Sequence, residues 1–126
     1  MPGVEKLLLT IKSLEFPSCV VTNSPSSLTD AMKRKQPLLS AVKNWVTREL
    51  YAYAKPAPDS YLKALELYAK KESRALGFED TFRGWKALDA AGVEGIVVSS
   101  CLTQEMKRSF QEKNVYMCSS FEDLFD

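Results

Sequence analysis

The chain has 126 residues, which is enough for one domain with a hydrophobic core and too few for two. Its 45% hydrophobic and 26% charged residues are typical of a soluble globular protein. Seventeen basic residues against 16 acidic ones leave a net charge of +1, which argues against a nucleic-acid binder or a membrane-surface binder, since both need an excess of positive charge.

The first third of the chain predicts two helices around a short strand. Apolar residues recur at helical spacing over residues 4–14, and Cys19, Val20 and Val21 form a short apolar run typical of a buried parallel strand. The helix that follows carries Leu28, Met32 and the cluster Lys33-Arg34-Lys35. We expect Asn23 or Ser24 to cap it, with Pro25 in its first turn.

The rest of the chain continues the alternation of helices and strands. Residues 38–45 suggest a further helical face, and residues 46–53 a strand or an irregular return. Later helices are expected near 58–69, 82–91 and 103–112, strands at 75–78, 95–100 and 115–118, and a final turn at 121–125. This alternation predicts a single α/β domain over residues 1–126, with a parallel sheet covered on both faces.

Cysteine and histidine usage limits the chemistry. Cys19, Cys101 and Cys118 have no metal-ligand spacing, so we expect reduced thiols in a cytoplasmic protein. The absence of histidine excludes Ser-His and Cys-His nucleophile pairs and His-ligated zinc. The apolar run at residues 7–11 is far shorter than a membrane span and lacks a signal-peptide cleavage site.

Three polar groups follow predicted strands, and ligands of parallel sheets bind at the carboxyl ends of strands. The segment 22–24 offers hydroxyl and backbone N–H groups to an anion. Lys55, held in a proline-rich segment, could neutralise a phosphate oxygen, and Glu79 with Asp80 suits a hard cation such as Mg²⁺. Taken singly, each group also has an ordinary structural interpretation: a helix cap, a surface lysine and a solvated turn.

Together these segments resemble three motifs of the haloacid dehalogenase superfamily, and their residues are most similar to those of the subgroup that contains β-phosphoglucomutase and phosphoglycolate phosphatase. The resemblance covers about residues 2–100. The segments that carry it are Val20-Val21-Thr22-Asn23-Ser24, Lys55-Pro56-Ala57-Pro58-Asp59, and Gly77-Phe78-Glu79-Asp80-Thr81 followed by Gly84, Ala87 and Ala90-Ala91-Gly92-Val93.

The resemblance implies a Rossmann-like three-layer core and a Mg²⁺-dependent phosphatase or phosphomutase acting on a small phosphorylated metabolite. It implies that Thr22, Asn23 and Ser24 bind the phosphoryl group and that Lys55 is catalytic as well as phosphate-binding. It also implies that Glu79 and Asp80 hold Mg²⁺. No nucleic-acid or membrane partner is expected.

One family motif has no match in this sequence. The nucleophilic aspartate of the family lies in an Asp-x-Asp motif on a central first strand, followed by a cap domain, and no aspartate of this chain stands in such a motif. We therefore expect the C-terminal part of the family core, inactive alone and lacking that strand and the cap. Three outcomes are then open. The two flanking strands pair with each other, another chain or a second copy supplies the missing strand, or the chain is a fragment of a longer protein. The alternative is a non-catalytic interaction or regulatory module.

Overall fold

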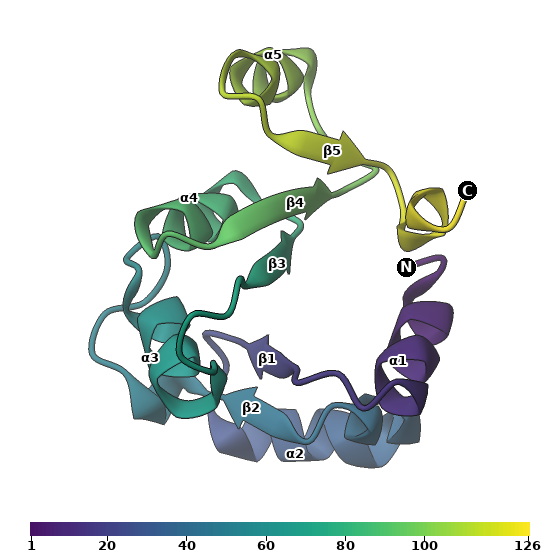
Figure 1. Ribbon diagram of the computed structural model, residues 1–126, viewed down its shortest axis with the longest axis vertical. Coiled ribbons are helices and arrows are strands. Elements are labelled where there is room, and N and C mark those ends of the chain that lie inside the picture. The colour runs from purple at the N-terminus through teal and green to yellow at the C-terminus, as the bar shows by residue number, and fades with distance from the viewer.

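The computed structural model describes residues 1–126 and has an α/β architecture in which helices flank short parallel strands (Figure 1). None of its helices has the length and apolar character required to cross a membrane. The elements are, in order, α1 (Val4–Ser13), β1 (Cys19–Val21), α2 (Ser26–Lys35), η1 (Pro37–Ala41), β2 (Asn44–Val46), η2 (Arg48–Leu50), α3 (Asp59–Tyr68), β3 (Leu76–Glu79), α4 (Phe82–Ala90), β4 (Glu94–Val98), α5 (Gln104–Glu112), β5 (Tyr116–Cys118) and η3 (Phe121–Leu124).

The strands form two sheets instead of one. β1 pairs in parallel with β2, and β3, β4 and β5 form a second parallel sheet in that order. No hydrogen-bonded ladder joins β1 to β3, so the two strands that flank the expected central position do not close up. The prediction of parallel strand pairing is confirmed, whereas the prediction of one continuous sheet is wrong.

Packing between helices joins the two sheets on one side. α3 lies on β1 and β2, α4 lies on β3 and β4, and α3 and α4 also contact each other. Their contact buries Tyr61, Ala87 and Leu88, against which the half-buried Val21 of β1 packs. A second cluster of Trp85, Val97 and Phe110 lies in the larger sheet, between β4 and the helices α4 and α5.

Side-chain caps and one glycine set the boundaries of the later helices. The hydroxyl of Thr81 accepts a hydrogen bond from the backbone N–H of Gly84, and that of Thr103 accepts one from Met106. Gly92 follows α4 with a φ of 74°, in the left-handed region that glycine occupies without steric cost. The predicted end of this helix at Gly92 is therefore confirmed.

The predicted cap of α2 is wrong. Pro25 occupies the cap position, and neither Asn23 nor Ser24 caps the helix. The carboxylate of Glu49, in η2, accepts hydrogen bonds from the backbone N–H and the hydroxyl of Ser26 at 2.8 and 3.1 Å. A negative charge here satisfies a free N–H group and interacts favourably with the helix dipole. The helix N-terminus that the sequence offered to an external anion is thus occupied by the chain itself.

The segment from residue 37 to residue 53 also differs from expectation. It forms the short helical turns η1 and η2 with β2 between them, where we expected one longer helical face followed by a strand or an irregular return. β2 pairs with β1 over three residues, so this region completes the smaller sheet. Pairing with a distant strand decides its structure, which local periodicity cannot reveal.

The contact of Glu49 with the N-terminus of α2 predicts acid sensitivity. Hydrogen bonds, first from the Ser26 backbone, lower the pKa of Glu49 from 4.5 to about 2. A lowered folded-state pKa contributes stability above pH 4.5, and this stability is lost as the pH falls from 4.5 toward 2. We expect Glu49→Gln to lower the thermal midpoint at pH 7 and to flatten its decline over this pH window.

The matched control is Glu112→Gln, which alters an exposed glutamate at the end of α5. It should leave the decline as steep as in the parent chain. An equal flattening by both substitutions would contradict the assigned role of Glu49.

Candidate functional site

A cavity of about 520 Å³ lies where β1 and β3 end. Three separate segments bring polar side chains to it, namely the turn after β1, the segment before α3 and the turn after β3. Five of its eleven lining residues are hydrophobic. The lining residues are Met1, Val21, Thr22, Asn23, Lys55, Phe78, Glu79, Asp80, Thr81, Val98 and Phe121.

Backbone hydrogen bonds hold Lys55, which lines this cavity. Its N–H donates to the Asn23 side-chain oxygen at 3.3 Å, and its carbonyl accepts a hydrogen bond from Arg83 at the start of α4. The peptide bond to Pro56 is cis. The lysine is therefore held from both sides of the break between the sheets.

The Lys55 ammonium group has three partners. It donates to the Val21 carbonyl of β1 at 3.1 Å and to the Tyr61 hydroxyl of α3 at 3.0 Å, and it forms an ion pair with Glu79 of β3. Only 11% of the lysine side chain and 8% of the glutamate side chain are exposed. Removing one member of such a buried pair leaves an uncompensated charge, so the pair is expected to matter for folding as well as for chemistry.

Tyr61 of α3 completes this network, although the sequence did not mark it as a site residue. Its hydroxyl donates to the Glu79 carboxylate, and its ring lies 4.7 Å from the Lys55 ammonium. Burial, then the charge of Glu79, strongly raises the pKa of Tyr61, so the phenol stays protonated. Tyr61 follows Lys55 by six residues, near the start of the helix after the Pro-x-Pro segment. This position in the sequence could have marked it as a neighbour of the lysine.

The turn after β1 is ordered by a second tyrosine that sequence analysis missed. The Tyr51 hydroxyl lies 2.8 Å from both the Thr22 carbonyl and the Asn23 side-chain oxygen. The Thr22 hydroxyl accepts from the Ser24 N–H at 3.0 Å. Thr22 and Asn23 line the cavity, whereas Ser24 lies beside it and shapes the turn. No local pattern around residue 51 marked this contact, because its partners are 28 and 29 residues away.

The two acidic residues after β3 have different surroundings. Glu79 is engaged by Lys55 and Tyr61, while Asp80 is exposed and lines the cavity. Gly84 of α4 leaves room for the Glu79 carboxylate, since a side chain there would clash with it. No three residues among His, Cys, Asp and Glu are grouped closely enough to hold a metal ion by themselves. Any cation here would rely on two carboxylates at most.

The site thus offers an ammonium group, a hydroxyl, an amide and one free carboxylate around a single cavity. Five of the six residues predicted from the sequence line it, namely Thr22, Asn23, Lys55, Glu79 and Asp80. Glu79 is brought in as the lysine's partner, and Ser24 is not brought to the cavity wall.

A family model and a curated relative both match this chain. A family model described as haloacid dehalogenase-like hydrolase matches residues 1–92. A probable pseudouridine-5'-phosphatase from Drosophila melanogaster is 28% identical over 115 residues, which are 86% of this chain and 50% of that protein. The chain therefore spans about half the length of this relative.

Solved structures share the fold. A putative β-phosphoglucomutase from Thermotoga maritima superimposes with a TM-score of 0.83 at 24% identity, covering 98% of this chain and 56% of the other. CbbY from Rhodobacter sphaeroides, solved in complex with phosphate, gives 0.81 at 24% identity, covering 98% and 55%. A haloacid dehalogenase-type hydrolase from Entamoeba histolytica gives 0.79 at 24% identity, covering 97% and 55%. The expected Rossmann-like core is confirmed.

The ion pair of Lys55 and Glu79 predicts strong coupling between two substitutions. Lys55→Met or Glu79→Gln alone should reduce the free energy of unfolding by roughly 3–5 kcal/mol, because each leaves the partner buried and unpaired. The double variant should lose less than the sum of the two single losses, by about 1–3 kcal/mol. Urea unfolding of the four proteins measures this coupling.

The control cycle uses Lys63 and Glu66, an exposed pair on α3 at 2.7 Å. Its coupling should stay below about 1 kcal/mol. If the losses from Lys55→Met and Glu79→Gln add, with a coupling energy no larger than that of the surface pair, the buried ion pair does not form.

Proposed function

The chain belongs to the haloacid dehalogenase-like hydrolases, and from this premise we propose that it supplies the phosphate-binding and Mg²⁺-binding groups of a phosphohydrolase core that acts on a small phosphorylated metabolite. One observation carries the proposal. Residues from three separate segments, Thr22 with Asn23, Lys55, and Asp80, line the same cavity at the ends of β1 and β3.

The proposed roles follow from charge and hydrogen-bonding capacity. Phosphoryl transfer depends mainly on positioning the phosphate and neutralising its charge. Lys55 would bind a phosphate oxygen with its ammonium group, and Thr22 and Asn23 would donate from a hydroxyl and an amide. Ser24 would contribute through the turn that it forms with Thr22. Because Lys55 is paired with Glu79, an incoming phosphate would compete for that ammonium.

Asp80, with Glu79 beside it, would hold Mg²⁺. The donor set fits, since Mg²⁺ in phosphate sites commonly uses one or two carboxylates and completes its shell with water and phosphate oxygens. A bound Mg²⁺ ion would supply further neutralisation of the phosphate charge. Asp80 is exposed to the cavity and free to bind, whereas Glu79 would first have to exchange its contact with Lys55.

The proposal assigns no covalent step to this chain. The only carboxylates that line the cavity are Glu79 and Asp80, and neither belongs to an Asp-x-Asp sequence. We therefore propose that residues 1–126 bind phosphate and are inactive alone. A cytoplasmic location, and a second copy or a complementing chain as partner, remain predictions alongside it.

A non-catalytic interaction or regulatory module is the second candidate, and one observation favours it. The catalytic lysine expected from the sequence is already satisfied by three partners within the chain, so the site is stable without a ligand. A module of this kind would keep the fold and bind neither phosphate nor Mg²⁺.

Ligand-dependent stabilisation distinguishes the two candidates. Inorganic phosphate with Mg²⁺ should raise the thermal midpoint of the chain, because a ligand at 100 times its dissociation constant adds about 2.7 kcal/mol to the free energy of unfolding. The rise should vanish in Lys55→Ala and persist in the control Lys63→Ala, which alters a surface lysine. Absence of any rise in the parent chain would favour the non-catalytic module.

A hydrolysis assay tests the claim that the chain lacks a nucleophile. With an aryl phosphate and Mg²⁺ we expect no turnover above the buffer rate. Turnover by the parent chain that disappears in Asp80→Asn would contradict this claim, because it would show a complete catalytic site within residues 1–126.

A further inference from the structure

Residues 48–51, which we call the clamp, are hydrogen-bonded to residues 22–24, which we call the anion turn. The backbone N–H of Arg48 donates to the Ser24 carbonyl at 3.0 Å, which fixes the start of the clamp. The guanidinium group of Arg48 donates to the carbonyl of Tyr51 at 2.8 Å, and it lies 5.1 Å from the centre of that tyrosine's ring. The tyrosine is therefore held in place by the same residue that joins the clamp to the turn.

The Tyr51 hydroxyl is buried against the anion turn. Only 8% of the tyrosine is exposed, and its oxygen lies 2.8 Å from both the Thr22 carbonyl and the Asn23 side-chain oxygen. Burial raises the pKa of Tyr51, so the phenol keeps its hydrogen and can donate it. Both neighbouring oxygens are acceptors, so the hydroxyl finds its partners in the turn.

The side chain of Asn23 is held by its oxygen. This oxygen faces the Tyr51 hydroxyl at 2.8 Å and the backbone N–H of Lys55 at 3.3 Å, and both of these groups are donors. An amide oxygen accepts and an amide NH₂ group donates, so the two donors determine which end of the amide faces them. The NH₂ group is left for the other side of the residue, and Asn23 lines the candidate cavity.

The hydroxyl of Thr22 is arranged in the same way. It accepts the N–H of Ser24 at 3.0 Å, so its own hydrogen is free to donate, and Thr22 also lines the cavity. The anion turn thus uses acceptor atoms for contacts within the chain and keeps donor groups for a ligand. Such a turn suits an oxyanion, whose oxygens accept hydrogen bonds, better than a cation.

We infer that Tyr51 is a positioning residue of the candidate phosphate site. Its hydroxyl holds the Asn23 oxygen on the side of the clamp, and this contact directs the Asn23 NH₂ group toward the ligand. Tyr51 does not line the cavity, so it acts through Asn23. The inference rests on the proposed phosphate binding, and it names the residue that makes the turn a hydrogen-bond donor.

Calorimetry with inorganic phosphate tests this role. Tyr51→Phe removes only the hydroxyl, and phosphate should bind roughly threefold to tenfold more weakly, which corresponds to the loss of about one hydrogen bond. Unchanged phosphate affinity in folded Tyr51→Phe would overturn the inference.

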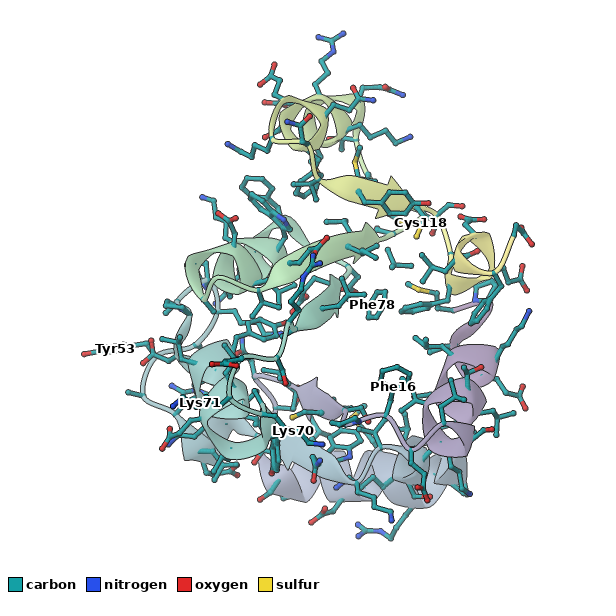
Figure 2. All side chains as sticks on the ribbon, in the orientation of Figure 1. Phe16, Tyr53, Lys70, Lys71, Phe78 and Cys118 are labelled. Atoms are coloured by element: carbon teal, nitrogen blue, oxygen red, sulfur yellow. The ribbon has the colours of Figure 1, made fainter.

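Two controls accompany this measurement. Figure 2 shows the Tyr53 side chain pointing away from the body of the molecule, where it is 71% exposed, so Tyr53→Phe should leave the affinity unchanged. Thr103→Ala removes a hydrogen bond that caps α5, far along the chain from the turn. It should lower the thermal midpoint and leave the phosphate affinity unchanged. A loss of affinity in Thr103→Ala equal to that in Tyr51→Phe would count against the inference, because any loss of stability would then weaken binding.

A double variant shows whether Tyr51 acts through Asn23. Asn23→Ala alone should weaken phosphate binding, because a donor is lost. Tyr51→Phe should then cause no further loss in the Asn23→Ala background, since the group that it orients is already absent. An equal loss from Tyr51→Phe in both backgrounds would contradict the inference.

NMR of the free chain tests the same arrangement without phosphate. The Asn23 side-chain NH₂ group should be rigid in the parent chain, with an order parameter of about 0.85, and mobile in Tyr51→Phe, below about 0.6. A mobile NH₂ group in the parent chain would overturn the inference by itself, so the test does not depend on whether Tyr51→Phe folds. Absence of phosphate binding in the parent chain would contradict the proposed function, while the mobility of Asn23 would still decide the role of Tyr51.

Discussion

The ammonium group of Lys55 joins the two halves of this structure at the place where their sheets do not meet. It contacts the Val21 carbonyl of β1 and the Glu79 carboxylate of β3, with the Tyr61 hydroxyl of α3 between them. Both charged side chains are nearly buried, so neither can be removed without leaving the other unpaired. One side chain thus takes part of the role that a central strand would have.

The candidate site depends on the same arrangement. Because Lys55 is anchored through Asn23 and Arg83, the turn after β1, the segment before α3 and the start of α4 are held around one cavity. Packing of α3 on α4 supports this geometry from one side. The candidate phosphate site therefore combines polar groups at the strand ends with hydrophobic lining residues in one cavity.

Sequence patterns predicted the local elements and the site residues that local chemistry marks. The β-branched run before Thr22 gave β1, Gly92 gave the end of α4, and the Pro-x-Pro segment singled out Lys55. Contacts between distant segments were not predictable. Glu49 caps a helix that begins 23 residues earlier, and Tyr51 orders a turn 28 residues away. Nothing in residues 19–21 or 76–79 alone indicates that their edges stay unpaired.

NMR of the free chain in solution shows most directly whether Lys55 bridges two strands that do not pair. We expect no regular cross-strand contacts between β1 and β3. We also expect a slowly exchanging Lys55 ammonium signal close to Val21, Tyr61 and Glu79. A continuous ladder of backbone contacts from Cys19–Val21 to Leu76–Glu79, with a freely exchanging Lys55 ammonium, would contradict this bridging role.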